Sequence, residues 1–276
     1  MGGILALTAG ACWGIGDFLG GLSAKRVHVL TVLLVSQALG AVGIAVWTGV
    51  AGEPFPGFVE VAPAVGAGVA GLVGLGALYR GLSIGAMGIV APISAAAPVI
   101  PLGADFIRGD TPSAVQWAGV ALVLTGVAVV SREPTHGERR FAVGVGLAVL
   151  AALGFGCFYV ALDAAATASV PWAVLVARWT GVAVVLAAAL AVAAPVRPPA
   201  ALLPALVGVA LFDTSANVLL ATATTKAAAG IVAVLTSVYP LVTIVLARLV
   251  LGEQLSASRR VGGVIALSGA ALVAAG

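Results

Sequence analysis

Charged side chains are scarce in this chain of 276 residues: 8% are Asp, Glu, Lys or Arg, where soluble domains carry about 25%. Apolar residues make up 62%, against roughly 45–50% in soluble proteins. A globule of this length cannot cover its surface with so few polar side chains. The composition therefore excludes soluble enzymes, nucleic-acid-binding proteins and disordered chains. It predicts an integral membrane protein with little material outside the lipid bilayer.

Cysteine and histidine are also nearly absent. Cys12 and Cys157 both fall inside apolar runs, where a disulfide framework is not expected. His28 and His136 lie in connecting segments without a Cys or Glu cluster. No phosphate-binding loop motif occurs in the sequence. We therefore predict no metal site, no cofactor, no ATP-driven step and no catalytic residue, and the N-terminus predicts no cleaved signal peptide.

Long hydrophobic runs are what the chain has in plenty. A bilayer core about 30 Å thick is crossed by roughly 20 residues of helix. The runs do not alternate polar and apolar residues, so they predict helices rather than a barrel. The ten predicted membrane helices are Gly3–Leu22, Val29–Val50, Val61–Tyr79, Met87–Ile107, Ser113–Val130, Val143–Leu162, Trp172–Val192, Leu202–Thr222, Ala228–Leu249 and Ser258–Ala275.

The longest polar stretch, residues 131–140, divides the runs into two sets of five. The halves resemble each other: the tetrapeptide Gly-Ile-Val-Ala occurs at 88–91 and at 230–233, and Pro98 matches Pro240. Because five is odd, the second set enters the membrane from the opposite side. We predict an all-α integral membrane fold of ten transmembrane helices, arranged as two inverted five-helix repeats over residues 1–131 and 141–276. Such a fold can expose a midplane site to each side in turn.

Several short motifs resemble the EamA-type ten-helix branch of the drug/metabolite transporter superfamily. These are Trp13-Gly14, the proline-bearing fourth and ninth runs, and the turn Leu-Gly-Glu-Gln-Leu-Ser at 251–256 before a Gly-rich last run. The resemblance covers essentially the whole chain. It implies a secondary transporter, exporting small organic metabolites across a bacterial-type cytoplasmic membrane, with a central cavity between the halves and no cofactor. The chain is expected to act as a monomer or homodimer.

The orientation of the chain stays open. Ten Lys and Arg residues lie in the loops after odd-numbered runs and two in the loops after even-numbered runs. The positive-inside rule then predicts that both termini lie outside. The family resemblance instead implies termini in the cytoplasm.

We assign three ionisable residues to the interior of the runs: Asp17, Arg178 and Asp213. A charge at the centre of a membrane helix costs roughly 2.5–3.5 kcal/mol on insertion scales, so each should face the bundle interior or a wet cavity. One interpretation makes Asp17 or Asp213 a proton or amine site and Arg178 an anion site. The other is a structural Arg178–Asp213 pair between neighbouring helices.

Polar, aromatic and proline residues complete the candidate site. Trp13 shares a helix face with Asp17, and Asn217 shares one with Asp213. Proline removes a backbone hydrogen bond, so helices should bend before Pro98 and Pro240 and either line the cavity or form packing kinks. The candidate substrate-binding or coupling residues are Trp13, Asp17, Gln37, Ser94, Pro98, Tyr159, Arg178, Asp213, Asn217, Thr236, Tyr239 and Pro240.

Two other functions remain open from the sequence. A passive channel would conduct without saturation, whereas an alternating carrier saturates and shows counterflow. A non-transporting membrane protein would move no metabolite and would bind a protein partner tightly.

Overall fold

The computed structural model describes residues 1–83, 94, 96–131, 138–252 and 257–276. These residues form helices joined by short connections, and they contain no strand. An all-α fold is therefore confirmed for this part of the chain. The helices are α1 (Gly2–Ala24), α2 (Val29–Val50), α3 (Phe58–Ser83), α5 (Val99–Arg108), α6 (Ala114–Ser131), α7 (Glu138–Ala166), α8 (Val170–Ala191), η1 (Ala200–Leu202), α9 (Leu203–Thr224), α10 (Ala229–Thr236), α11 (Tyr239–Leu251) and α12 (Ala257–Ala275).

Seven helical stretches in the described residues are long and apolar enough to cross a bilayer. They correspond to the first three predicted runs and to the sixth through ninth. Two shorter apolar helices, Ala114–Val129 and Arg260–Ala275, correspond to the fifth and tenth runs. Residues 84–93 and 95, which hold much of the fourth run, lie outside the described residues. The chain is a multi-pass membrane protein, and ten crossings remain a prediction.

Two helices extend well past the predicted runs. Helix α3 begins at Phe58 and ends at Ser83, and α7 runs from Glu138 to Ala166. The predicted boundaries, 61–79 and 143–162, are too short because hydrophobicity marks only the part of a helix that lies in lipid. Backbone hydrogen bonding continues past that part into the polar interface, where it needs no apolar side chains.

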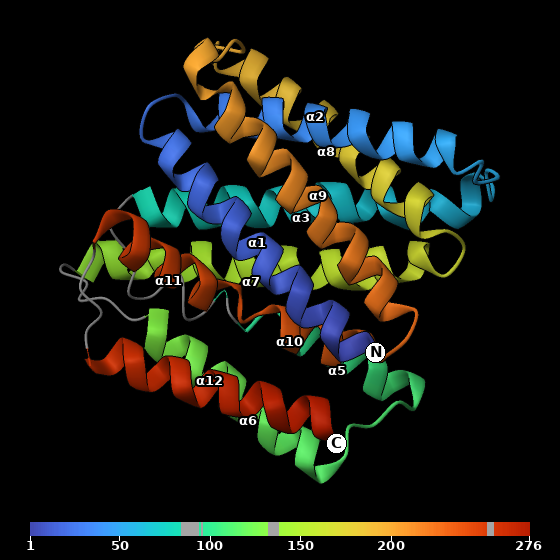
Figure 1. Ribbon diagram of the computed structural model, residues 1–276, viewed down its shortest axis with the longest axis vertical. Helices are drawn as coiled ribbons and strands as arrows, with labels where there is room; N and C mark the ends of the chain where they lie inside the picture. The colour runs from blue at the N-terminus through green and yellow to red at the C-terminus, as the bar shows by residue number, and fades with distance from the viewer. Residues whose placement is uncertain (84–93, 95, 132–137, 253–256) are drawn as a thin grey trace.

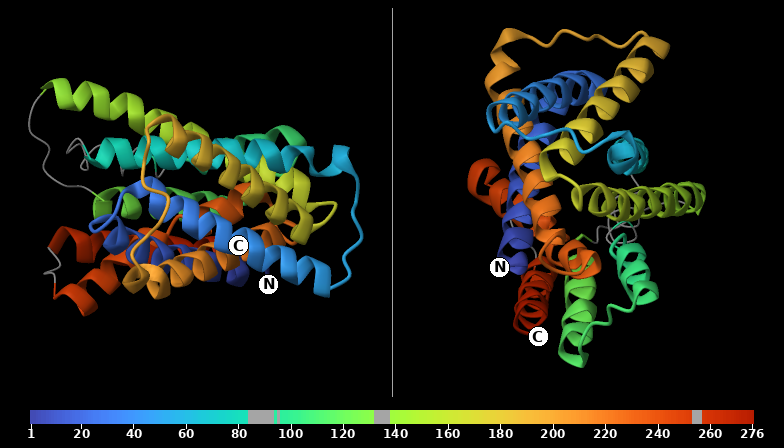
Figure 2. Two further views of the ribbon diagram at one scale, coloured as in Figure 1. Left: turned by 90° about the horizontal axis from the view of Figure 1, so that it is seen from above. Right: turned by 90° about the vertical axis from the view of Figure 1, so that its right-hand side faces the viewer.

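The helices form a broad bundle (Figure 1). Helices α2 and α8 pack together at one end of its longest axis, and α6 and α12 pack together at the other. Helices α1, α3, α7 and α9 lie between these two pairs, with α1 packed on α9 and α3 on α7 (Figures 1 and 2). Both termini lie toward the end of the bundle where α5 ends and α10 begins (Figure 1).

The surface of the bundle is apolar and its interior is built from small side chains. Val50, Phe58 and Ile107 are each more than 80% exposed, whereas Ala6 and Ala9 of α1 are fully buried. Large apolar side chains on the outside suit a lipid environment, in which small residues at helix contacts let the backbones approach closely.

The predicted interruption of the ninth run near Pro240 is confirmed, whereas that of the fourth run stays a prediction. Helix α10 ends at Thr236, and α11 begins at Tyr239 with Pro240 in its first turn. Pro98 directly precedes the first residue of α5. Within the ninth run two helical segments therefore meet at Pro240, as the missing backbone donor requires, and the part of the fourth run at 84–93 and 95 lies outside the described residues.

Glycines of α1 pack against the joint between α10 and α11. A Cβ atom at Gly10 would lie 2.9 Å from the carbonyl oxygen of Thr236, and one at Gly14 would lie 2.6 Å from that of Tyr239. The same arrangement recurs in α7, where a Cβ at Gly156 would lie 2.4 Å from the Ile100 side chain, just after the interruption at Pro98. At Gly10 and Gly14 glycine is required because the two backbones almost touch, whereas Gly156 makes room for the Ile100 side chain.

Candidate functional site

Helices α2, α8 and α9 bring three polar side chains together inside the bundle. The Nη1 atom of Arg178 on α8 donates to Oδ2 of Asp213 on α9. The same nitrogen donates to Oε1 of Gln37 on α2, at 2.7 Å. We call Gln37, Arg178 and Asp213 the central polar group. The Arg178–Asp213 pair that the sequence offered as one interpretation is therefore present.

Burial differs sharply across this group. The side chain of Arg178 is 2% exposed and that of Asp213 is 29% exposed. Removing one partner of a buried pair leaves an uncompensated charge and costs about 3–5 kcal/mol. The pair therefore stabilises the bundle only while both members are present, and Asp213 lies on the side of the pair that remains accessible.

The central polar group also contains unused hydrogen-bonding atoms. Nε and Nη2 of Arg178 are buried, and no described residue accepts from them. The side-chain oxygens of Asn217 and Thr214, on α9 beside Asp213, are likewise buried without a partner in the described part of the chain. Buried polar atoms are nearly always hydrogen-bonded, so such a concentration of unused atoms is typical of a site that receives a ligand or water.

Small residues allow these helices to approach closely enough for the side chains to meet. A Cβ atom at Gly40 of α2 would lie 2.3 Å from the Thr214 hydroxyl on α9. A Cβ at Gly181, one turn after Arg178, would lie 3.4 Å from Oε1 of Gln37. A side chain at Gly40 would press on Thr214, so this glycine lets α2 approach α9, whereas Gly181 leaves Gln37 in ordinary contact distance.

Asp17 on α1 lies near the central polar group and remains accessible. Its side chain is within electrostatic reach of Asp213 on α9 and of Tyr239 on α11. The residue is nevertheless exposed. That Asp17 faces the bundle interior rather than lipid stays a prediction.

Three aromatic rings lie around Trp13, which is one turn before Asp17 on α1. The Trp13 ring lies 6.3 Å from Phe158, 6.1 Å from Tyr159 and 6.5 Å from Tyr239, measured between ring centroids. We call these four residues the aromatic group. The Tyr159 hydroxyl is hydrogen-bonded to that of Thr236 at 3.2 Å, and both residues are buried. The aromatic group thus lies against the joint between α10 and α11.

The predicted site residues therefore fall into three sets. Gln37, Arg178 and Asp213 meet in the central polar group, with Asn217 one turn further along α9 and Asp17 nearby. Trp13, Tyr159, Thr236 and Tyr239 meet around the joint. Pro98 and Pro240 mark the two interruptions, and Ser94 is buried just before the first of them. Phe158 is a member of the aromatic group that the sequence alone did not single out.

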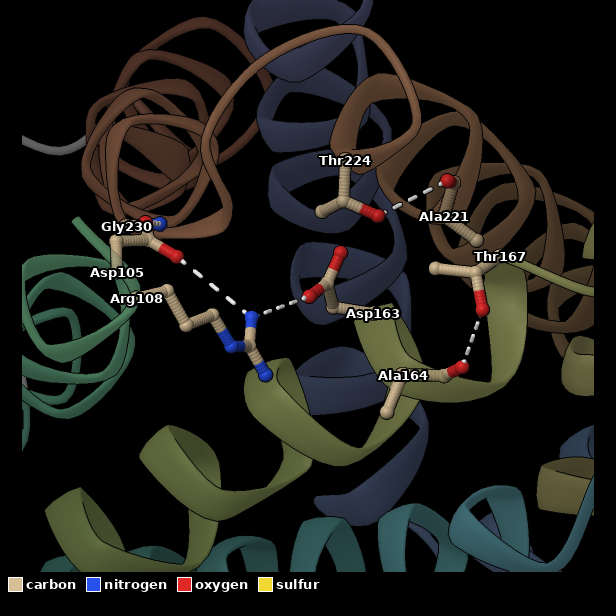
Figure 3. Close-up of polar contacts among 8 residues, drawn as sticks. All are labelled: Asp105, Arg108, Asp163, Ala164, Thr167, Ala221, Thr224 and Gly230. Carbon is tan, nitrogen blue, oxygen red and sulfur yellow. Dashed lines mark hydrogen bonds and ion pairs between the residues drawn. The ribbon is translucent and has the colours of Figure 1, made fainter. Parts of the chain in front are cut away.

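A second polar cluster lies at the end of the bundle where α5 ends and α10 begins, and Figure 3 draws its side chains. Oδ2 of Asp105 on α5 accepts from the backbone amide of Gly230, in the first turn of α10. Arg108 lies between two carboxylates, 3.8 Å from Asp105 and 3.1 Å from Asp163 on α7 (Figure 3). We call Asp105, Arg108, Asp163 and the Gly230 amide the end network. It connects α5 to α7 and α10.

The end network corrects the sequence analysis. Asp105 lies inside the run Met87–Ile107, so the assignment of only three ionisable residues to the interior of the runs is wrong. A position so close to the end of a run looks like a solvated interface, yet Asp105 is 3% exposed. A carboxylate that precedes an arginine by three residues is the sequence signal that could have marked it.

A cavity of about 480 Å³ opens beside the end network. Its walls include Asp105, Asp110, Gln116 and Ala228, which come from the end of α5, the start of α6 and the connection into α10. No cluster of three His, Cys, Asp or Glu side chains suited to a metal ion occurs among the described residues.

The fold and its interior charges define a multi-pass, all-helical membrane protein with a polar site between its helices. The model of the EamA-like transporter family matches the chain twice, over residues 1–132 and 142–275. The chain belongs to this family, and so to the drug/metabolite transporter superfamily.

No curated protein sequence matches the chain. One solved structure, described only as the crystal structure of a protein, is similar to it with a TM-score of 0.80 and 17% sequence identity. The similarity covers 98% of this chain and 95% of that one. At this identity the likeness shows the fold alone.

Proposed function

We propose that the chain is a secondary transporter, not an enzyme, that exports a small organic metabolite across a bacterial cytoplasmic membrane by alternating access. Membership of a transporter family supports the transport of a small molecule. The observation that carries the proposal is the central polar group, a buried guanidinium with unused donors beside an accessible carboxylate. Ionisable groups inside membrane helices mark substrate and ion pathways more often than they serve structure alone.

The proposal includes two inverted five-helix repeats, over residues 1–131 and 141–276. Pairs of contacts related by an offset of about 142 residues support it. Gly14 packs on Val242 and Gly156 packs on Ile100, while α1 packs on α9 as α7 packs on α3. Such pairing is expected when two like units are related by a two-fold axis in the membrane plane.

We place the substrate near the bundle centre, between Asp17, the central polar group and the aromatic group. Helix α10 ends, and helix α5 begins, near the middle of its predicted run, where unwound backbone offers polar atoms to a ligand. The end network then closes the side nearest the termini, because it fixes α5 to α7 and α10. In the opposite state these ion pairs separate, and Asp17 or Asp213 exchanges a proton with the open side.

Counterflow in proteoliposomes tests this function. Vesicles preloaded with one unlabelled compound of an amine, amino-acid, organic-acid or nucleoside panel should accumulate the same compound in labelled form. The uptake should saturate and should fall at least several-fold in Asp213→Asn. Conduction without saturation would instead identify a passive channel. Absence of flux for every compound, together with a tightly bound protein partner, would favour a non-transporting role.

Exchanging the two charges separates a structural pair from a working site. The double variant Arg178→Asp, Asp213→Arg should fold, because the pair is retained with opposite polarity. If these residues contact the substrate or a proton, the double variant should remain without transport. Recovery of counterflow in the double variant would show that the pair serves only structure.

A further inference from the structure

Arg178 uses only one of its three guanidinium nitrogens. Nη1 donates to both Gln37 and Asp213, whereas Nε and Nη2 have no acceptor among the described residues. The residue is 2% exposed, so bulk water does not satisfy these donors. Two adjacent donors left unused on a buried cation provide a place for an acceptor that arrives with a ligand.

The two free nitrogens lie on one edge of the planar group. Their N–H bonds run nearly parallel, and this edge is suited to two oxygens held in one plane. We propose that the transported molecule carries a carboxylate and that the Nε–Nη2 edge of Arg178 binds it with two parallel hydrogen bonds. The inference rests on the proposed transport function and specifies the chemical group by which the site recognises its substrate.

The surrounding charges favour a carboxylate over a phosphate. Asp213 already occupies Nη1, and Asp17 lies within electrostatic reach of Asp213. Arg178 is the one cation bonded within the described central polar group. Among the described residues this region holds one cation and two acidic side chains, so the second negative charge of a phosphate has no further cation to offset it.

Access and nearby polar atoms fit a ligand that enters past Asp213. Asp213 and Gln37 are partly exposed, whereas Arg178 lies behind them. The unused side-chain oxygen of Asn217, one turn along α9, can accept from a hydroxyl or ammonium group of the same ligand. The substrate therefore combines a carboxylate with a hydrogen-bond donor.

Pairs of acids and their primary amides test the proposal on the purified full-length protein. The probes are acetate with acetamide, propionate with propionamide and 3-phenylpropionate with 3-phenylpropionamide. Each acid should raise the thermal unfolding temperature, while its amide, inorganic phosphate and sulfate should not. Arg178→Lys keeps the charge but loses the planar edge, so acid binding should weaken by about tenfold. Arg197→Lys, at an exposed loop position, should bind the acids as the unaltered protein does.

Several outcomes would overturn the inference. They are equal acid binding by Arg178→Lys, equal stabilisation by amides and acids, or stronger stabilisation by phosphate or sulfate. Failure of all three acids would also overturn it, because acetate needs nothing from the site except the guanidinium edge. Should Arg178→Lys fail to fold, nitrogen NMR of arginine-labelled protein replaces it: acetate, and not acetamide, should shift a buried Nε signal.

The inference and the transport function can fail separately. Saturable counterflow of a neutral or cationic compound without acid binding would retain the transporter and discard the carboxylate site. Acid binding at Arg178 without any counterflow would retain the site and discard transport.

Discussion

The Arg178–Asp213 pair shows that the replacement of a single residue can lower the stability of the whole bundle. Replacing Asp213 by asparagine removes the charge that offsets a buried guanidinium. Gln37 still accepts from Nη1, and Asp213 is partly exposed, so the loss should fall near the lower limit of the range for broken buried pairs. We expect Asp213→Asn to lower the free energy of unfolding by about 3 kcal/mol, as measured by denaturant unfolding in detergent micelles.

Asp110→Asn is the matched control, because Asp110 is an exposed carboxylate in the loop after α5. Its effect should stay within about 0.5 kcal/mol. Replacing both members of the pair by leucine should recover most of the lost stability, since no unpaired charge then remains. A single Asp213→Asn variant as stable as the unaltered protein would show that the pair contributes nothing.

Some residues of the candidate site could be predicted from the sequence, and others could not. Asp17, Arg178 and Asp213 stand out because charges in apolar runs are rare and costly, and the structure places all three near one another. The partners of Arg178 are less visible, because a glutamine in a distant helix carries no signal of which charge it contacts. Phe158 is hidden for the same reason: an aromatic residue in an apolar run looks like any other lipid-facing or packing residue.

At the scale of elements, Gly14 determines how closely α1 approaches the joint between α10 and α11. A Cβ atom there would lie 2.5 Å from Cβ of Val242 and 2.6 Å from the Tyr239 carbonyl oxygen. One of these neighbours is backbone, so the contact cannot relax by a side-chain rotation. We expect Gly14→Ala to destabilise the protein by about 1–3 kcal/mol, as overpacking does, in the same unfolding assay.

Gly21 on the same helix supplies the comparison. No described atom lies within 4 Å of a Cβ built there, so alanine meets no obstacle and gains helix propensity. Gly21→Ala should leave stability unchanged or raise it by about 0.5–1 kcal/mol. Equal destabilisation by both variants would mean that close packing at Gly14 is not the cause.

Pro240 tests whether the interruption in the ninth run is needed for movement. Alanine restores a backbone donor that can bond to the carbonyl four residues earlier, that of Thr236. We expect Pro240→Ala to fold with unchanged or greater thermal stability and to lower the maximal counterflow rate several-fold, because a continuous helix cannot bend at this joint. Pro199→Ala, in the exposed segment before η1, should transport normally. Unaltered counterflow in Pro240→Ala would contradict a working role for the interruption.

Helix boundaries were predictable where the sequence contains a proline or glycine that interrupts or ends a helix. Pro240 removes a donor, and the structure separates α10 from α11 there, while α5 begins directly after Pro98. Gly109 and Gly252 end α5 and α11 in the left-handed conformation, with φ of 95° and 70°. The ends of α3 and α7 were not predictable, because a helix leaving lipid changes its surroundings without changing its backbone.

At the scale of the whole molecule, contacts between distant segments were the least predictable feature. Periodicity shows that a helix has a packing face but does not say which helix covers it. The end network depends on a hydrogen bond from the backbone amide of Gly230 to Asp105, which lies 125 residues away in the sequence. Every residue type except proline has such an amide, so no sequence motif marks this contact. The repeat was visible as matched residues, yet it could not show that Asp105, Arg108 and Asp163 would meet at one end.

The end network makes a prediction about how this end of the bundle opens. Asp105 is almost fully buried and accepts from the first turn of α10, whereas the Arg108 side chain is 47% exposed. A buried charge-assisted hydrogen bond is worth about 1.5–3 kcal/mol, and a half-exposed ion pair about 0–1 kcal/mol. Asp105→Ala should therefore loosen the contact between α5 and α10 much more than Arg108→Ala does.

Amide hydrogen exchange measures this difference directly. In Asp105→Ala the first turn of α10, residues 229–232, should exchange roughly 10-fold to 100-fold faster, which corresponds to the loss of that hydrogen bond. Arg108→Ala should change the same amides by less than about fivefold, and the amides of α12 should not change in either variant. Uniform acceleration across the bundle would indicate global destabilisation instead of local opening. Equal effects of the two variants would show that the ion pairs, and not the capped amide of Gly230, hold this end closed.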